Sequence, residues 1–186
     1  MPAFDFGSSK ELRHKLEALD KSQATIEFEL DGTVVTANAN FLTAMGYRLE
    51  EIKGQHHSMF VDPKERDSAE YRSFWENLRR GEFMAAEYKR VAKGGREIWI
   101  QASYNPVLGD DGKPYRVMKL ATDITAAKQR SAENQGQIDA INRSQAVISF
   151  DLKGVIIEAN ENFLGAVGYT LEEIKGQHHS MFADPA

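Results

Sequence analysis

An internal repeat is the feature of this sequence that most limits how the chain can fold. The segment from Leu49 to Phe60 recurs without change as Leu171 to Phe182. The match continues upstream at the same offset, and roughly two-thirds of the positions agree between residues 20–64 and residues 142–186. Because repeated sequences fold into repeated units, we expect one complete domain and the first part of a second domain of the same fold.

The second copy is expected to be truncated, because it has no counterpart of residues 65–125, which are predicted below to supply three of the five strands. A sheet without those strands would expose unpaired edges, so we expect the chain to be part of a longer protein. The predicted organisation is an N-terminal amphipathic helix (1–22), a complete domain (23–125), a coiled-coil linker helix (126–144) and the start of a second domain (145–186).

Each copy is preceded by a segment with the spacing of an amphipathic helix. Leu12, Leu16 and Leu19 recur every three or four residues among charged residues, and Ile138 and Ile141 occupy equivalent places in the linker. Apolar residues at this spacing form a seam along one helix face that packs against a partner helix. We therefore predict a homodimer that forms through these flanking helices.

Between the helices, strand and helix patterns follow one another in an order typical of an α+β domain. Two strands joined by Asp31-Gly32 come first, short helices follow between Asn38 and Gly54, and a longer helix covers 68–80. Three further strands, joined by glycine-containing turns, occupy 83–122. This order predicts a five-stranded antiparallel sheet with short helices on one face and an internal pocket between the two layers.

The composition excludes several classes of function. The chain has no cysteine, which rules out disulfides, thiolate metal sites and cysteine nucleophiles. A net charge of -5 with interspersed signs gives no basic stripe, so we expect no nucleic-acid partner. The longest apolar runs, such as Ile98–Ile100, are far shorter than the roughly 20 residues that cross a bilayer. We expect no membrane segment in this chain and a cytoplasmic location.

No residue pattern typical of catalysis is found. An enzyme would need a nucleophile with a base, paired carboxylates, a phosphate-binding loop or a metal site at suitable spacing. The glycine-rich stretch Lys93-Gly94-Gly95 is expected in a hairpin turn and not before a helix, so it does not resemble a phosphate-binding loop. The chain is therefore predicted not to be an enzyme.

Several motifs in register resemble the PAS sensory domains of bacterial methyl-accepting chemotaxis receptors of the aerotaxis or energy-taxis type. The motifs span most of the first copy: Asp31-Gly32, Asn38-x-Asn40-Phe41, Gly46-Tyr47-x-Leu49-Glu50-Glu51-Ile52-x-Gly54, Phe74-Trp75-x-x-Leu78-x-x-Gly81, Lys93-x-Gly95, Trp99–Pro106 and Asp123-Ile124-Thr125. Each motif alone is weak, and together they are specific.

The resemblance implies a sensor of redox state, gas or a small ligand. In that family the state of the pocket is relayed through the final strand into a coiled-coil helix and on to a receptor signalling domain, which would lie outside this chain. The alternative is a cofactor-free PAS module for dimerisation or interaction in a histidine kinase or a cyclic-dinucleotide enzyme. The linker helix, whose seam includes Ala127 and Ser131, suits a shifting joint and a plain spacer equally well.

A histidine pair, His56 and His57, is the main candidate for cofactor chemistry. A neutral imidazole is the usual axial ligand of haem iron. Neighbouring residues on a helix point about 100° apart, so only one of the pair can face a pocket. His57 resembles the histidine of flavin-binding aerotaxis receptors and is the candidate axial ligand of haem b. The alternatives are contact with FAD and packing beneath the sheet without a cofactor, and the sequence favours the last.

Three further residues are candidates for lining the pocket together with His57. Asn40 offers an amide that can bind a ligand edge, and Met118 lies on the last predicted strand. Trp99 offers an indole on a strand whose alternation also places Gln101 and Ser103 on the same face, and core packing is its alternative role. The predicted site for a cofactor or small-molecule ligand is therefore His57, Asn40, Trp99 and Met118.

Overall fold

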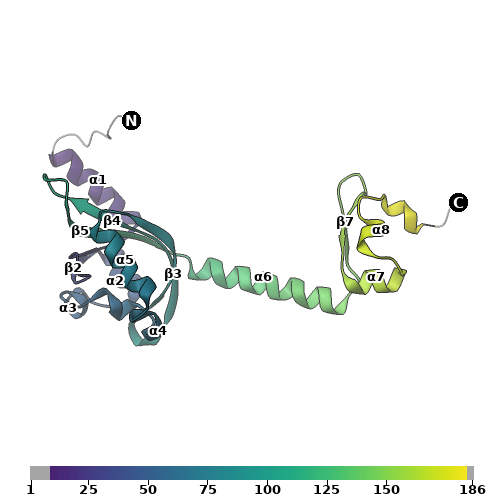
Figure 1. Cartoon of the computed structure of the whole chain (residues 1–186), viewed down its shortest axis with the longest axis horizontal. Helices are drawn as coiled ribbons and strands as arrows, with labels where there is room; N and C mark the ends of the chain where they lie inside the picture. The colour runs from purple at the N-terminus through teal and green to yellow at the C-terminus, as the bar shows by residue number, and fades with distance from the viewer. Residues whose placement is uncertain (1–8, 184–186) are drawn as a thin grey trace. The chain divides into compact units, whose positions relative to one another are not determined.

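The computed structural model describes residues 9–183 of the chain, so the ends of the predicted N-terminal helix and of the second copy, residues 1–8 and 184–186, lie outside the described residues. The chain divides into two compact units, Met1–Ala126 and Ala127–Ala186, which are described separately (Figure 1). Within residues 9–183, no helix has the length and apolar character that crossing a membrane requires.

The first unit contains the elements that the sequence predicts, in the predicted order, together with three short helical segments (57–60, 63–66 and 93–95) that it does not predict. They are α1 (Ser9–Ser22), β1 (Ala24–Phe28), β2 (Val34–Ala37), α2 (Ala39–Met45), α3 (Leu49–Ile52), η1 (His57–Phe60), α4 (Pro63–Arg66), α5 (Ala69–Arg79), β3 (Met84–Val91), η2 (Lys93–Gly95), β4 (Glu97–Leu108) and β5 (Pro114–Asp123).

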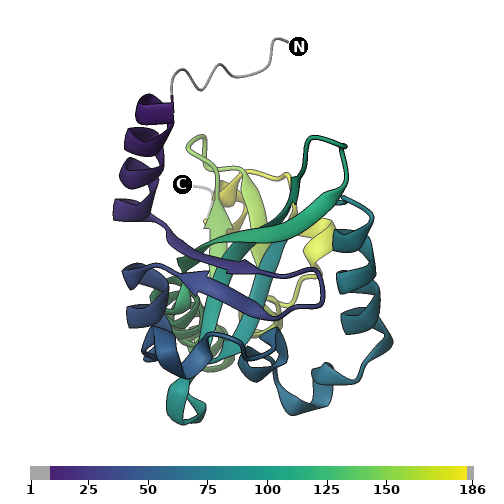
Figure 2. The ribbon, with the colours of Figure 1, turned by 90° about the vertical axis from the view of Figure 1, so that its left-hand side faces the viewer.

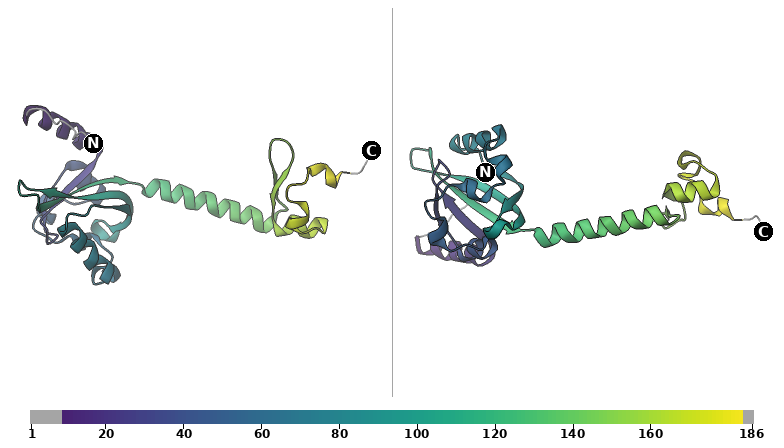
Figure 3. Two further views of the ribbon diagram at one scale, coloured as in Figure 1. Left: turned by 45° about the horizontal axis from the view of Figure 1, so that its top comes forward. Right: turned by 90° about the horizontal axis from the view of Figure 1, so that it is seen from below.

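The strands form one antiparallel sheet in the order β2-β1-β5-β4-β3. The two strands from the start of the domain thus pair with its last strand, which becomes the centre of the sheet. The predicted α+β fold with a five-stranded antiparallel sheet is confirmed. The helices α1 and α5 lie apart in Figure 2 and in the left view of Figure 3.

Alternation along the strands gives the sheet an inner face that packs against α2, α3, η1 and α5. On β4 the residues Ile98, Ile100, Ala102 and Tyr104 are buried, while the residues between them are partly or fully exposed. The space between sheet and helices is filled by a core cluster that includes Phe28, Phe41, Phe60, Trp75 and Leu78. At the centre of the predicted pocket, the structure therefore places packed aromatic side chains.

The second unit repeats the first part of this architecture. Its elements are α6 (Thr125–Ser144), β6 (Ile148–Phe150), β7 (Ile156–Ala159), α7 (Glu161–Val167), α8 (Leu171–Ile174) and η3 (His179–Phe182). Local hydrogen bonds recur as well: the amide of His57 donates to the carbonyl of Gly32 at 2.8 Å, and the amide of His179 donates to that of Gly154 at 2.8 Å. The same sequence thus forms the same local structure twice.

Gly32 brings the turn between β1 and β2 against the segment that precedes η1. Its φ is 92°, a backbone angle that residues other than glycine rarely adopt. A Cβ built on Gly32 would lie 2.6 Å from Nε2 of His56. Gly54 also has a positive φ, 78°, but a Cβ built there meets nothing within 4 Å. Backbone conformation constrains both glycines, and steric contact constrains Gly32 alone.

Replacing Gly32 with alanine is expected to lower the free energy of unfolding of the first unit by about 2 kcal/mol, and Gly54→Ala by about 1 kcal/mol. The difference reflects the clash with His56. The two tryptophans, Trp75 and Trp99, both lie in the first unit, so urea unfolding followed by tryptophan fluorescence reports on this unit. Equal losses in the two variants would show that the close approach to His56 carries no energetic weight.

Candidate functional site

The centre of the candidate site is His57, which is fully buried in the first unit. It begins η1, directly after the exposed His56, whose own side chain accepts from the amide of Ser58 and caps this short helix. The Nδ1 atom of His57 lies 2.8 Å from the hydroxyl of Tyr71 on α5, and Nε2 lies 3.0 Å from the hydroxyl of Tyr104 on β4. One imidazole therefore links three elements that are far apart in the sequence.

Aromatic rings enclose this hydrogen-bonded centre. The ring of His57 contacts Phe28 and Trp75 edge-on, at 5.2 and 5.5 Å between centroids, and stacks with Tyr71 at 5.8 Å. Phe74 packs edge-on against Tyr104 at 4.8 Å. An apolar enclosure strengthens the hydrogen bonds inside it and makes any unpaired polar atom costly.

Two basic side chains are buried beside Tyr104. Arg90 on β3 is 5% exposed, and Lys119 on β5 is 1% exposed. Lys119 lies opposite Tyr104 in the pairing of β4 with β5, and its Nζ is 4.9 Å from the centre of the Tyr104 ring. An Nη2 of Arg90 lies 3.5 Å from the Tyr104 hydroxyl. The three strands β3, β4 and β5 thus bring two cations and a phenol together in the core.

Burial and these cations shift the titration of the site. Burial lowers the pKa of His57 well below its ordinary value, and the charges of Lys119 and Arg90 lower it further. Burial also lowers the pKa of Lys119. For Tyr104, burial acts to raise the pKa, but Lys119 and Arg90 together more than reverse this, so the pKa lies below its ordinary value. The imidazole is therefore neutral at physiological pH.

The arrangement of His57 fits a packed, hydrogen-bonded core histidine. Axial ligation of haem iron requires a ring nitrogen with a free lone pair facing an open space. Both ring nitrogens of His57 are instead within hydrogen-bond distance of tyrosine hydroxyls. His57 could bind iron only if one of these hydrogen bonds were given up, so as they stand these residues do not fit haem.

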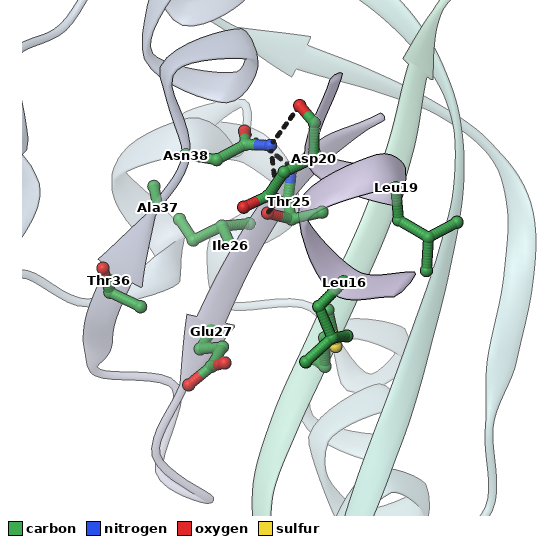
Figure 4. A pocket seen from close by; sticks show the side chains of 10 residues that line it. Leu16, Leu19, Asp20, Thr25, Ile26, Glu27, Thr36, Ala37 and Asn38 are labelled. Atoms are coloured by element: carbon green, nitrogen blue, oxygen red, sulfur yellow. Dashed lines mark hydrogen bonds between the residues drawn. The ribbon is translucent and has the colours of Figure 1, made fainter. Parts of the chain in front are cut away.

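Asn40 joins the domain to the helix that precedes it. Its Nδ2 donates to the carbonyls of Asp20 and Gln23, at 2.7 and 3.1 Å. Asn38 caps α2 and also donates to the carboxylate of Asp20 at 3.0 Å, next to a hollow of about 290 Å³ between α1 and the sheet (Figure 4). The predicted ligand amide is therefore engaged with the end of α1.

The same joint recurs in the second unit. Asn160 and Asn162 donate to the carbonyl of Asn142, both at 3.0 Å, and to that of Gln145, at 2.7 and 3.1 Å. Asn142 and Gln145 belong to the last turn of α6 and the residue after it. In both copies, an asparagine pair at the start of the helix after the second strand thus holds the end of the preceding helix.

Met118 and Trp99 lie on the other face of the sheet from His57. Both are partly buried, and alternation along β5 and β4 separates them from the buried Lys119 and Ile98. Met118 lines the hollow beneath α1 together with Leu16 and Leu19. The structure therefore does not bring the four predicted site residues together: His57 lies in the core, Asn40 at the end of α1, and the other two on the outer face.

Trp99 instead lies where the chain leaves the sheet. Its amide donates to Oγ1 of Thr125 at 2.9 Å, and its carbonyl accepts from the amide of Ile124 at 2.8 Å. The carboxylate of Asp123 accepts from the amide of Thr125 at 2.8 Å, which completes the start of α6. Residues at the ends of β4 and β5 thus fix the first residues of the exit helix.

Comparison with known families identifies the fold. A family described as "PAS fold" matches residues 34–121, and a family described as "PAS domain" matches residues 144–186. The chain belongs to the PAS domain family. The first match lies in the first unit, which has the five-stranded sheet, and the second match lies in the repeated segment of the second unit.

Two curated relatives come from bacterial sensing. The biofilm dispersion protein BdlA of Pseudomonas aeruginosa is 44% identical over 170 residues, which are 91% of this chain and 41% of that protein. The aerotaxis receptor of Escherichia coli is 30% identical over 97 residues, which are 52% of this chain and 19% of that protein. The chain thus spans less than half the length of either relative. These similarities confirm the predicted relationship to PAS sensory domains of chemotaxis and energy-taxis proteins.

Solved structures agree on the fold. The PAS domain of a protein from Colwellia psychrerythraea superposes with a TM-score of 0.55 at 22% identity, covering 62% of this chain and 98% of that domain. An RNA-binding light-oxygen-voltage receptor superposes with a TM-score of 0.57 at 18% identity, covering 78% of this chain and 42% of that one. At these identities, the likeness concerns the PAS fold alone.

Sequence reasoning missed the partners of His57. Tyr71 and Tyr104 become partners of His57 only through tertiary packing, but Lys119 leaves a signal in the sequence. In β5 the order Val117-Met118-Lys119-Leu120-Ala121 places the lysine on the same face as the buried Val117 and Ala121. A basic residue at a core position of an alternating strand is a reason to look for a buried polar site.

The free energy of unfolding of the first unit is expected to fall as the pH drops below about 6.5, the ordinary pKa of histidine. The unfolded chain binds a proton on His57 there, whereas the folded domain, in which the pKa is lower, does not. Above the ordinary pKa, His57 is neutral in both states and its protonation does not reduce the free energy of unfolding. Below it, the free energy of unfolding falls by at most about 1.4 kcal/mol per pH unit.

The check is urea unfolding between pH 5 and 8 with two variants. His57→Phe should lose this pH dependence, and His14→Gln, at an exposed position on α1, should keep it. An unchanged slope in His57→Phe would show that the buried imidazole is not its source.

Proposed function

We propose that this chain is a non-catalytic PAS sensory module of a bacterial signal transduction receptor, most closely of the chemotaxis type. A single observation carries the proposal: β4 holds both Tyr104, which contacts the buried centre at His57, and Trp99, which holds the start of α6. The names of the two curated relatives, an aerotaxis receptor and a biofilm dispersion protein, support a role in sensing.

In this proposal, a change at the buried centre acts on α6 through two adjacent strands. Tyr104 and Trp99 are five residues apart on β4, or roughly 17 Å along a strand. Lys119, opposite Tyr104, lies on β5, which ends at Asp123 and the cap of α6. Backbone hydrogen bonds between β4 and β5 make the pair stiff along its length, so a shift in the core moves the helix start.

The helices that precede the two PAS segments, α1 and α6, are held at their ends by the same kind of asparagine contact. Asn40 and Asn38 bind the end of α1, and Asn162 and Asn160 bind the end of α6. In tandem PAS units, such a joint would pass the position of a helix into the next unit. This arrangement favours α6 as a signalling element over a plain spacer.

The signal in this proposal is a redox state, a gas or a small ligand. A second candidate is a cofactor-free module for dimerisation, and one observation favours it. Leu12, Leu16 and Leu19 of α1 are 36%, 45% and 47% exposed, and Ile138 and Ile141 of α6 are 52% and 47% exposed. Apolar seams left open on both helices suit pairing with a second copy of the chain.

Tyr104→Phe is expected to raise the exchange rate of the Ile124 amide several-fold relative to that of Glu29, whose amide bonds to Thr33 at the far side of the sheet. The variant removes the hydroxyl that joins His57 and Arg90 to β4. NMR hydrogen exchange of the full chain measures both amides. Tyr47→Phe, the same chemical change at a partly buried position beside the core, is the control, and an equal ratio in the two variants would contradict the relay.

Light scattering of the full chain is expected to give about twice the mass of one chain, which is 20.9 kDa. Leu12→Glu combined with Leu16→Glu should give the mass of one chain, because both charges lie on the leucine seam of α1. His14→Glu combined with Ala18→Glu adds two charges at the same spacing on another face and should leave the dimer intact. A wild-type mass of one chain would exclude pairing through α1.

A further inference from the structure

A groove between helices α4 and α5 and strand β3 leads from the surface of the first unit to the buried centre. Its volume is about 700 Å³. The strand wall is formed by Met84, Ala86, Tyr88 and Arg90, which share one face of β3 by alternation, and the helix wall includes Tyr71, Phe74 and Asn77. The groove is thus mainly apolar and aromatic, with polar groups at its inner end.

Arg90 is the most deeply buried of the polar side chains that line this groove. Its Nη1 donates to the carbonyl of Lys89 at 2.8 Å, its Nη2 reaches the hydroxyl of Tyr104 at 3.5 Å, and its Nε has no hydrogen-bond partner. The guanidinium also lies 4.6 Å from the centre of the Tyr88 ring. A buried donor without a protein partner costs free energy, and a ligand atom that accepts a hydrogen bond from it would remove this cost.

The charge at this place is not balanced by the protein. Arginine stays protonated in proteins, and neither Arg90 nor Lys119 forms an ion pair with a carboxylate anywhere in residues 9–183. Glu65 and Glu70 line the groove but are exposed at its rim. Even a fully ionised Tyr104 would balance only one of the two cations. A buried charge without a partner is strongly destabilising, so the site calls for an anion.

We infer that this groove binds an aromatic carboxylate, whose carboxylate pairs with Arg90 and whose ring packs among Tyr71, Phe74 and Tyr88. The planar guanidinium matches a carboxylate with two parallel hydrogen bonds, and aromatic walls favour a flat apolar body. The inference rests on the proposed sensory function and names the ligand class for it. Such a ligand touches Tyr71 and Arg90, which bond to the two ends of the His57–Tyr104 centre.

The test is calorimetric titration of the full chain with 2-naphthoate and with 2-naphthamide, which has the same shape and no charge. The acid is expected to bind at least about tenfold more tightly, because only it neutralises Arg90. Equal dissociation constants, or no binding of either compound at millimolar concentration, would overturn the inference. This comparison needs no variant, so it stands even where a core substitution disturbs folding.

Two variants locate the site. Arg90→Met should weaken naphthoate binding at least about tenfold and leave thermal stability without ligand unchanged or higher, since it removes an unpaired buried charge. Lys89→Met removes the neighbouring charge on the opposite face of β3, where Lys89 pairs with Glu97, and should bind as the wild type does. Equal weakening in both variants would show that binding follows overall charge and would overturn the assigned site.

The test of the ligand site and the test of the relay from Tyr104 to α6 can fail independently. Exchange at Ile124 is measured without ligand, so a response to Tyr104→Phe together with absent naphthoate binding would leave the relay standing and reject this ligand class. Naphthoate binding that depends on Arg90, together with unchanged exchange at Ile124, would establish the ligand site and reject the relay.

Discussion

The two hydrogen bonds of the buried His57 imidazole are the interaction on which the arrangement of the first unit depends. They join η1 to Tyr71 on α5 and to Tyr104 on β4. Burying an imidazole in an aromatic core is unfavourable unless both nitrogens find partners, so α5 and β4 must lie where their hydroxyls meet the ring. The position of α5 over the sheet is thus tied to one polar residue.

The repeat separates what local sequence determines from what tertiary packing determines. The segment Leu49–Phe60 and its copy Leu171–Phe182 form the same helices, caps and backbone hydrogen bonds. The full burial of His57 depends in addition on Tyr71, Phe74 and Tyr104, which come after the repeated segment in the sequence. The helices and strands could therefore be predicted from periodicity and glycine placement, whereas the environment of the histidine could not.

The dependence on tertiary packing also explains why the four predicted site residues do not lie together. Alternation correctly grouped Trp99 with Gln101 and Ser103 on one face of β4, but alternation does not say which face the helices cover. That choice follows from the connection through α5, and it places Trp99 opposite His57. Asn40 carries an amide suited to a ligand, yet the same donor satisfies the free carbonyls at the end of α1, which a sequence pattern cannot distinguish.

The unpaired charge at Arg90 and the anchoring of α6 belong to one mechanical unit. Arg90, Tyr104 and Lys119 lie on the adjacent strands β3, β4 and β5, and the last two strands hold the first residues of α6. In the proposed sensor, an anion bound at Arg90 would offset the unfavourable interaction of Arg90 with Lys119 on the far side of Tyr104. A ligand that binds only the folded domain also stabilises it by mass action. In the proposed sensor, charge balance in the core and order at the start of α6 would therefore change together, because β4 and β5 connect the two places.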